Sequence, residues 1–228
     1  MDGPTIRFNL GGAHLPFPTR MTVMRLSRGR LLVHSPTALT PELQHELSRL
    51  GSVAWLIGPN RLHYWWLPEW VAAFPAAAAY LAPRTKRQAG RHIPFQGLPL
   101  DARDGYPWDE TVATLPVFGR FMTEVVFFHR PTRTLVLTDL IENFERQRVT
   151  SRFMRWLIRL GGVEAPRGGM SRDLRFTFAR DDLREAVEEM IGWNPERVII
   201  AHGRWFPRDG AAELRRAFAW LLRQRPAP

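Results

Sequence analysis

The sequence predicts an α/β fold in one domain, built from short apolar strands that alternate with amphipathic helices. The chain has 228 residues, of which 45% are hydrophobic, and this is enough to bury a sizeable core. Runs such as VAWLIGP and ERVIIAHG are continuously apolar, which is typical of strands covered on both faces of their sheet. Helical patterns separate these runs. We expect one domain over residues 1–228, with an irregular lead-in over residues 1–20.

The first half predicts a hairpin, two helices and two strands. MTVMRLSRGRLLVHSP indicates two short strands joined by a Ser-Arg-Gly turn. TALTPELQHELSRLGS predicts a helix that is capped by Thr40, has Pro41 in its first turn and ends before Gly51. The strand VAWLIGP follows, and His63 lies just past its end. A helix around LPEWVAAF and a short strand at AAAYLAP complete this half.

The second half begins with a Pro- and Gly-containing loop, GLPLDARDGYPWDET. Two strands are expected after it, over residues 124–129 and 134–138, around a turn at Pro131. RQRVTSRFMRWLIRL predicts a helix over residues 146–160. Asp181 is expected to cap the helix DLREAVEEMIGW, and the buried strand ERVIIAHG delivers His202. A last helix over DGAAELRRAFAWLLRQ closes the chain.

The composition excludes several classes of protein. There is no cysteine, so disulfides and thiolate metal ligands are ruled out. No apolar run approaches the roughly 20 residues that a membrane span needs, and the N-terminus lacks a signal-peptide layout, so we expect a cytoplasmic protein without a transmembrane segment. The net charge is +10, carried almost wholly by arginine, because Lys86 is the single lysine. This bias has two interpretations: GC-rich codon usage, or an anionic partner.

The interpretation as an anionic partner site applies most directly to the helix predicted over residues 146–160. Its apolar residues are expected on one side, against the core, and its arginines largely on another. The apolar set is Val149, Phe153, Trp156, Leu157 and Leu160, and the basic set is Arg148, Arg152, Arg155 and Arg159. A solvated outer face explains the pattern. Contact with an anionic membrane surface or with nucleic acid remains the alternative.

Three potential metal ligands share one structural position. His63, Asp139 and His202 each stand just past the carboxyl end of an apolar strand. In layered α/β proteins, ligands collect at these ends, so we expect the three side chains to converge. Neutral imidazole and carboxylate are ligand types that zinc, iron and manganese accept, and two histidines with one carboxylate leave positions open for water or substrate.

The order of these pieces resembles the metallo-β-lactamase-like superfamily, and more closely a bacterial branch of it catalogued as a domain of unknown function. The segments that carry the resemblance are LVHSPTALTPEL, PNRLH, EVVFFHRPTRTLVLTDLIENF and VIIAHG. They are spread over most of the chain from about Met21 onward. The resemblance implies an αββα sandwich of the metallo-β-lactamase-like type, with a metal cleft at one edge of two facing sheets.

The metal motif of that superfamily is only partly present. Its His-x-His-x-Asp-His turn falls on GPNRLH, where Gly58 and Asn60 stand in place of histidines, Leu62 in place of the aspartate, and His63 matches the last histidine. A further family histidine would fall near Arg120 or Phe121 and is missing. The resemblance makes Asp139 the bridging aspartate and His202 the terminal histidine. One metal position is thus retained in reduced form.

These observations lead to two hypotheses about function. In the first, the chain is a metal-dependent hydrolase of unknown substrate, with one divalent metal, zinc before iron or manganese, on His63, Asp139 and His202. Bound water is the nucleophile, and Asp139 and Asn60 form the catalytic set, Asn60 offering a carbonyl oxygen to the metal or a hydrogen bond to the substrate. In the second, it is an inactive binding protein without metal that uses its arginine-rich surface for an anionic partner.

Other conspicuous residues have structural explanations. Tyr64 and the nearby tryptophans are expected mainly in the core, although a tyrosine beside His63 can face a cleft. Glu124 needs a partner if it is buried, either an arginine such as Arg120 or the metal site. Ser35 is expected in a turn or a cap, since no nucleophile triad surrounds it.

Overall fold

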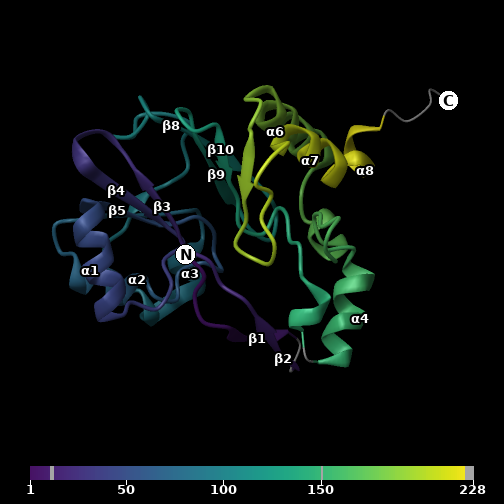
Figure 1. Cartoon of the computed structure of the whole chain (residues 1–228), viewed down its shortest axis with the longest axis horizontal. Coiled ribbons are helices and arrows are strands. Elements are labelled where there is room, and N and C mark those ends of the chain that lie inside the picture. The colour runs from purple at the N-terminus through teal and green to yellow at the C-terminus, as the bar shows by residue number, and fades with distance from the viewer. Residues whose placement is uncertain (11–12, 150, 224–228) are drawn as a thin grey trace.

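Two β-sheets face each other, and helices cover the outer face of each (Figure 1). The computed structural model describes residues 1–10, 13–149 and 151–223. The first sheet runs in the order β3 (Thr22–Arg25), β4 (Arg30–His34), β5 (Ser52–Gly58), β6 (Ala78–Leu81) and β7 (Leu98–Pro99). The second runs β11 (Arg197–Ile199), β10 (Thr134–Val136), β9 (Glu124–His129) and β8 (Val112–Val117). The αββα sandwich expected from the sequence is confirmed.

The strands that precede the three predicted ligands are mostly in parallel pairs. In the first sheet, β3 and β4 form the expected antiparallel hairpin around a 3-10 turn (Ser27–Gly29), whereas β5 is parallel to both β4 and β6. In the second sheet, β10 is antiparallel to β9 but parallel to β11. The carboxyl ends of β10 and β11 therefore meet at the same edge.

Alternation along the strands divides the core into layers. On β9, Val125 and Phe127 face the first sheet, while Val126 and Phe128 face the helices that cover the second sheet. Strand β5 does the same, with Trp55 directed between the sheets. Both sheets are thus apolar on both faces, which explains why their strands are continuous apolar runs in the sequence.

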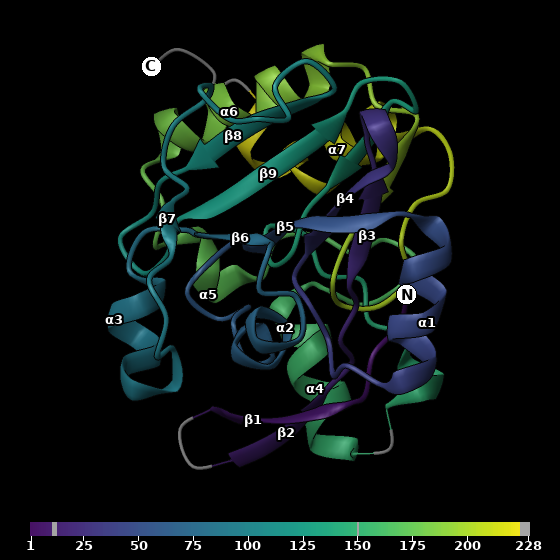
Figure 2. The same ribbon diagram turned by 90° about the vertical axis from the view of Figure 1, so that its left-hand side faces the viewer.

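The helices fall into a group that covers the two sheets and a group that lies at the edge of the sandwich (Figure 2). Those that cover the first sheet are α1 (Pro41–Leu50) and α2 (Leu67–Ala73), and those that cover the second are α6 (Arg180–Gly192), α7 (Gly210–Ala217) and α8 (Ala219–Leu222). The edge group is α3 (Thr85–Ala89), α4 (Arg152–Gly161) and α5 (Arg172–Arg175), with 3-10 turns at Gly90–His92 and Arg146–Arg148. In the described part of the chain, no helix is long and apolar enough to cross a membrane.

The predicted helix over residues 41–50 is confirmed with its signals. Thr40 Oγ1 accepts a hydrogen bond from the Leu43 backbone N–H at 3.2 Å, and Pro41 occupies the first turn. Gly51 ends the helix where a side chain would not fit, because a Cβ there would lie 1.9 Å from the Gly29 carbonyl oxygen. The turn after α1 therefore brings the chain directly into β5.

The expected irregular lead-in is wrong, because residues 1–20 contain an antiparallel hairpin. Its strands are β1 (Ile6–Leu10) and β2 (Ala13–Phe17). The sequence IRFNL alternates apolar and polar residues, which is the period of a strand, and this signal was missed. Strand β8 was missed as well. It contains Pro116 and lies at the edge of its sheet, where proline is tolerated.

Three helix boundaries also differ from the prediction. The helix expected over residues 146–160 begins at Arg152, because Ser151 Oγ accepts a hydrogen bond from the Met154 N–H at 3.2 Å and caps it there. Helix α6 begins before Asp181, which lies in the first turn and makes no cap hydrogen bond. The last helix is broken at Phe218, which has non-helical backbone angles (φ −103°, ψ 17°).

Candidate metal centre

Three loops bring His63, Asp139 and His202 together, as the sequence predicts. The loops follow β5, β10 and β11, and each residue offers one ligand atom within 4.8 Å of the other two. His202 Nε2 lies 3.0 Å from Asp139 Oδ1 and 3.2 Å from His63 Nε2. His63 Nε2 lies 3.3 Å from Asp139 Oδ2. Folding therefore assembles one cluster from residues far apart in the chain.

These separations suit a metal polyhedron. For ligand atoms about 2.1 Å from a metal, neighbouring ligands are about 3.0 Å apart in octahedral and about 3.4 Å apart in tetrahedral geometry. Among His202 Nε2, His63 Nε2 and Asp139 Oδ1 the three separations are 3.0, 3.2 and 3.4 Å, which lie within this range. The donor set, two imidazole nitrogens and one carboxylate, is one that zinc, iron or manganese accepts.

His202 is oriented by its outer nitrogen. Nδ1 lies 2.7 Å from the Pro18 carbonyl oxygen, which can only accept, so Nδ1 carries a proton and Nε2 faces the cluster. The following Gly203 has φ of 92°, and a Cβ there would lie 2.0 Å from the Asn143 carbonyl oxygen. The dipeptide His-Gly in the sequence thus marks a turn that packs tightly against a neighbouring backbone.

His63 is oriented in the same way by Ser35. The Ser35 Oγ lies 2.7 Å from His63 Nδ1, which leaves Nε2 directed at the cluster. Ser35 follows β4 directly and has φ of 53°. The expectation of a simple turn or cap missed this contact. The signal was available, because Ser35 stands past the carboxyl end of a parallel strand, as the three ligands do.

Asn60 positions the aspartate and the turn rather than offering its oxygen to the cluster. Its Nδ2 donates to Asp139 Oδ2 at 2.6 Å and to Thr138 Oγ1 at 2.9 Å. Its Oδ1 accepts from the backbone N–H groups of Leu62 at 2.7 Å and His63 at 3.1 Å. Asn60 is fully buried, so both ends of its amide are engaged inside the protein. The expected carbonyl ligand is therefore not supplied by this geometry.

Glu124 holds the loop that carries Asp139. Its carboxylate is fully buried and accepts from the backbone N–H groups of Thr138 at 2.7 Å, Asp139 at 2.8 Å and Leu140 at 3.0 Å. Arg120, considered as its partner from the sequence, is exposed. Backbone donors replace the expected arginine. Outer-shell carboxylates of this kind orient ligand groups and are part of how metal sites are built.

The cluster atoms lie close enough for a metal ion or a proton to stand among them. In the neutral ring of His202 the proton is on Nδ1, which donates to Pro18, so the lone pair of Nε2 faces Asp139 Oδ1 and His63 Nε2 across 3.0 and 3.2 Å. In the metal-free protein a proton takes this place: burial opposes it, but the hydrogen bond and charge of Asp139 raise the pKa of His202 to about 9. Although burial opposes ionisation, His63 and His202 hold the pKa of Asp139 well below its usual range.

The cluster opens into a cavity of about 550 Å³. Ser35, Leu62 and Glu142 line it together with the three predicted ligands. Burial raises the pKa of Glu142 to about 8, against the effect of the nearby His202. Tyr64 and Trp70 are in the core, as expected, and Trp66 packs against it, whereas Trp65 is 47% exposed. Tyr64, Trp65 and Trp66 also line the cavity.

The comparisons with known proteins identify the family and the fold. A family model described as "Domain of unknown function (DUF4336)" matches residues 9–151, well over half of the chain. The chain belongs to this family. No curated protein matches the sequence of this DUF4336 member.

Solved structures of low sequence identity share the fold of this DUF4336 member. The DIM-1 metallo-β-lactamase has a TM-score of 0.61 at 11% identity, covering 90% of this chain and 87% of that one. A structure described as a peroxy diiron species of the chemotaxis sensor ODP has a TM-score of 0.59 at 15% identity, covering 89% and 85%. The Flv1 flavodiiron core from Synechocystis sp. PCC6803 has a TM-score of 0.58 at 10% identity, covering 92% of this chain and 53% of that one. The metallo-β-lactamase-like fold is thereby confirmed.

Proposed function

We propose that this chain is a metal-dependent hydrolase that holds one divalent metal on His63, Asp139 and His202. The observation that carries the proposal is the convergence of three ligand atoms whose outer partners, Ser35 Oγ and the Pro18 carbonyl among them, direct them to one point. A divalent metal bound there lowers the pKa of water and polarises an ester, amide or phosphoryl oxygen. The one-domain organisation, bacterial origin and cytoplasmic location remain predictions.

A single zinc ion is the form we propose. Two imidazoles and a carboxylate suit zinc, and Gly58, Asn60 and Leu62 stand where a second metal would need ligands. Within the described residues, His63, Asp139 and His202 form the one group of three or more candidate ligands. Iron is the alternative, since two of the structures with this fold are described as a diiron species and a flavodiiron core.

The protein's own groups divide the remaining work. Asn60 and Glu124 hold Asp139 in place through the contacts described above. Leu62 stands where the turn of the superfamily has an aspartate, and we assign the proton-transfer role to Glu142, an acid that lines the cavity. With a pKa of about 8, set mainly by burial, its carboxyl can hold a proton near neutral pH and deliver it to a leaving group.

Metal analysis of protein purified without a metal-affinity tag tests this function. We expect about one metal per chain in the parent protein and near-complete loss in His63→Ala and His202→Ala, because each variant removes one of three ligands. His129→Ala is the matched control, because His129 lies at the far end of β9 and forms a hydrogen bond with Thr132. This variant is expected to retain the metal. Absence of metal from the parent protein after zinc, iron or manganese supplementation would refute the proposal.

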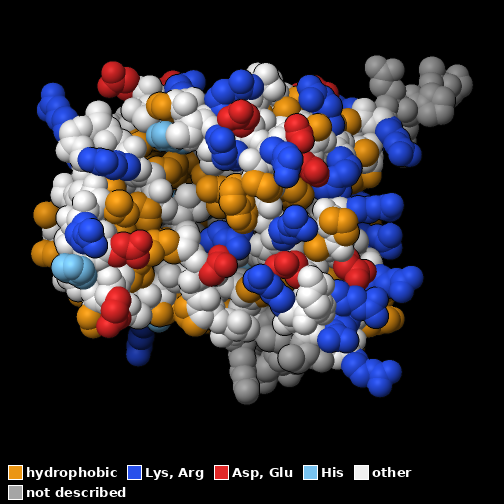
Figure 3. Space-filling model, in the orientation of Figure 1, with side chains coloured by type: hydrophobic (Ala, Val, Ile, Leu, Met, Phe, Trp, Pro, Cys, Tyr) orange, Lys and Arg blue, Asp and Glu red, His pale blue; other side chains and the backbone are white. Residues whose placement is uncertain are grey.

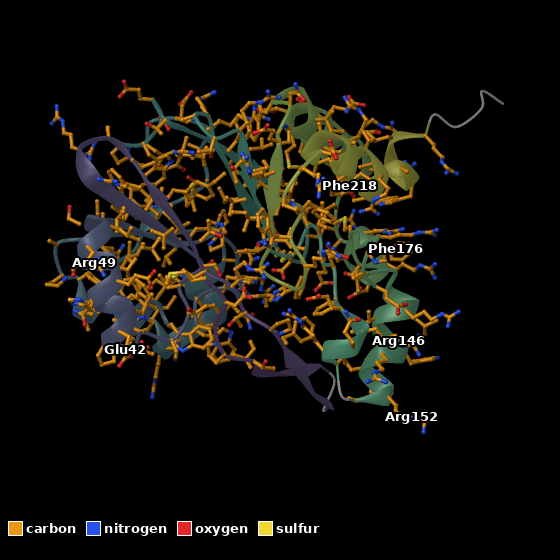
Figure 4. The ribbon with its side chains drawn as sticks, viewed as in Figure 1. Glu42, Arg49, Arg146, Arg152, Phe176 and Phe218 are labelled. Atoms are coloured by element: carbon orange, nitrogen blue, oxygen red, sulfur yellow. The ribbon has the colours of Figure 1, made fainter. Side chains whose placement is uncertain are left out.

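Helix α4 supports a second candidate function, binding to an anionic membrane. The sequence places Phe153 and Trp156 against the core, but they are 54% and 56% exposed and stack on each other at 6.1 Å. The rest of the protein covers only part of the apolar stripe of α4. Met154 and Ile158, on its inner side, are buried. Arginines project beside this stripe at the same edge of the molecule, as Figure 3 and Figure 4 show for the region of Arg146 and Arg152.

Co-sedimentation with lipid vesicles tests the membrane candidate. Aromatic side chains mixed with arginine favour the boundary of an anionic bilayer over nucleic acid, for which phosphate-binding cations alone suffice. We expect binding to phosphatidylserine vesicles but not to phosphatidylcholine, reduced about tenfold by Trp156→Ser, while Phe118→Ser, at an exposed aromatic outside α4, has no effect. Binding to duplex DNA that Trp156→Ser leaves unchanged would favour nucleic acid instead.

A further inference from the structure

We infer that the cavity beside the metal centre binds an extended alkyl or acyl chain. The substrate class is then an ester, thioester or amide of a long-chain acid. The reaction assigned to this substrate rests on the proposed function, whereas binding of the chain rests on the cavity alone. In the reaction, water adds to the acyl carbon and the bond from that carbon to the leaving oxygen, sulfur or nitrogen breaks. One proton of the water passes to the leaving group, and the products are the acid and an alcohol, thiol or amine.

The walls of the cavity are predominantly apolar. Helix α4 contributes Met154, Leu157 and Ile158 from its inner side. Phe17, from the hairpin β1–β2, packs against the hydrophobic cluster that contains Met154 and Ile158, and it also lines the cavity. Figure 1 and Figure 2 both show α4 and the hairpin side by side at the lower end of the molecule. These two elements, neither of which carries a candidate ligand, thus form an apolar compartment next to the polar cluster.

The apolar wall continues to the surface of the protein. Trp65, Phe121 and Leu160 all line the cavity, yet they are 47%, 42% and 46% exposed. They come from three separate segments of the chain. Exposed apolar side chains that line a cavity are typical of a ligand-binding groove. A chain that enters past this exposed rim would bury these side chains together with its own methylene groups.

The charged groups that line the cavity supply no net positive charge for an anionic substrate. Besides the metal cluster, its ionisable residues are two acids, Glu142 and Asp173, and one base, Arg172. Burial keeps Glu142 protonated near neutral pH, and Asp173 and Arg172 carry opposite charges, so a polyanionic metabolite would find no cluster of cations there, although the protein as a whole carries a charge of +10. A neutral acyl group needs no such cluster. The cavity volume of about 550 Å³ is also within the range of sites that enclose one small molecule.

Binding of straight-chain alcohols tests the inference without requiring catalysis. The probes are butanol, hexanol, octanol and decanol, titrated into the full chain by isothermal calorimetry. They are uncharged, so their affinity reports the apolar walls. We expect each added methylene to tighten binding about fourfold until the cavity is filled, with a negative heat-capacity change. An affinity that does not change with chain length would overturn the inference.

Two variants locate the site of binding. Leu157→Trp fills the cavity from α4 and should weaken octanol binding at least tenfold, whereas Phe153→Ala changes an exposed residue of the same helix outside the cavity and should leave it within twofold. Leu160→Ser, at the exposed rim, is the second test in case Leu157→Trp destabilises the fold, and it should weaken binding about threefold. Octanol affinity that is unchanged in both Leu157→Trp and Leu160→Ser would contradict the assignment.

The two proposals can fail separately. Alcohols that bind with the expected chain-length dependence to the parent protein and equally to the metal-free His63→Ala variant support an apolar-chain site whatever the fate of the hydrolase. Hydrolysis of acetyl thioesters, accompanied by no gain in rate or affinity for octanoyl thioesters, would retain the hydrolase and refute the long-chain substrate.

Discussion

Replacing Glu124 by leucine is expected to lower the free energy of unfolding by about 3 to 5 kcal/mol. The carboxylate is fully buried and is the acceptor for three consecutive backbone N–H groups, on Thr138, Asp139 and Leu140. Leucine fills a similar volume but leaves all three donors without a partner in a region from which water is excluded. Each unsatisfied donor costs about 1 to 3 kcal/mol. Urea denaturation of the metal-free protein measures the difference.

Glu124→Gln separates the loss of hydrogen bonds from the change in shape. The amide retains one oxygen but turns an NH₂ group toward a backbone N–H, so an intermediate loss of about 2 kcal/mol is expected. The control is Glu110→Gln, at an exposed carboxylate, which should change stability by less than about 0.5 kcal/mol. If Glu124→Leu were as stable as the parent protein, the carboxylate could not be the element that holds the Asp139 loop.

Glu124→Leu is also expected to weaken metal binding. Asp139 N–H is one of the three donors, so loss of the acceptor frees the loop that aims the Asp139 carboxylate. Outer-shell changes of this type cost about 10- to 100-fold in metal affinity. Stability and metal binding are thereby linked through one buried side chain that touches neither solvent nor the expected metal position.

The metal cluster could be found from the sequence because its signal is local. A buried parallel strand is a continuous apolar run, and a histidine or aspartate just past it stands out in one dimension. His63, Asp139 and His202 each have this signature, and the structure brings them together. Ser35 has the same position after β4 but was set aside, because hydroxyl residues are common in turns for reasons unrelated to a site.

The partners of buried groups could not be found in this way. The sequence indicates that a carboxylate at the start of β9 needs a partner. Backbone N–H groups, however, occur at every residue except proline, so the sequence does not show which of them is the donor. The partner of Glu124 is therefore visible only once β9 and β10 are adjacent. Asn60 is a similar case, since its amide spans two loops that only the fold brings together.

Helix α4 shows a further limit of sequence periodicity. The pattern predicts an apolar stripe, and the stripe exists, but periodicity does not say how much of it another element covers. In the structure the inner side lines the cavity, and Phe153 and Trp156 lie outside it. The apolar-chain cavity and the membrane surface therefore use adjacent sides of this one helix.

Metal binding is expected to displace the proton of His202, and this gives the second large effect. In the metal-free protein the pKa of His202 is about 9, since the hydrogen bond and charge of Asp139 outweigh burial. Below this pH a metal must replace the proton, so its affinity should rise about tenfold per pH unit from about pH 7 to about pH 9 and then level off. Calorimetry in buffers of different ionisation enthalpy should detect about one proton released per metal at pH 7.5 and progressively fewer above pH 9.

Stability without metal should change with pH in the opposite sense. The folded pKa of His202, about 9, is above the value of about 6.5 expected for an unfolded histidine. Its contribution, on the order of 3 kcal/mol, is therefore fully present below about pH 6.5 and lost as the pH rises through 9. Glu142 acts in the same direction, because burial keeps its carboxyl protonated up to about pH 8.

The comparison of metal-loaded and metal-free protein isolates the His202 proton. At a fixed free metal concentration about 1,000 times the dissociation constant at neutral pH, the metal adds about 4 kcal/mol of stability at that pH. At the same metal concentration this gain should be larger at pH 9 than at pH 6, because at pH 9 His202 is protonated in only about half of the molecules. Asp139→Asn removes both the ligand and the charge that raises the pKa of His202, so it should abolish the gain and flatten the pH dependence together. A gain that is independent of pH in the parent protein would mean that the metal, if bound, does not use His202 Nε2.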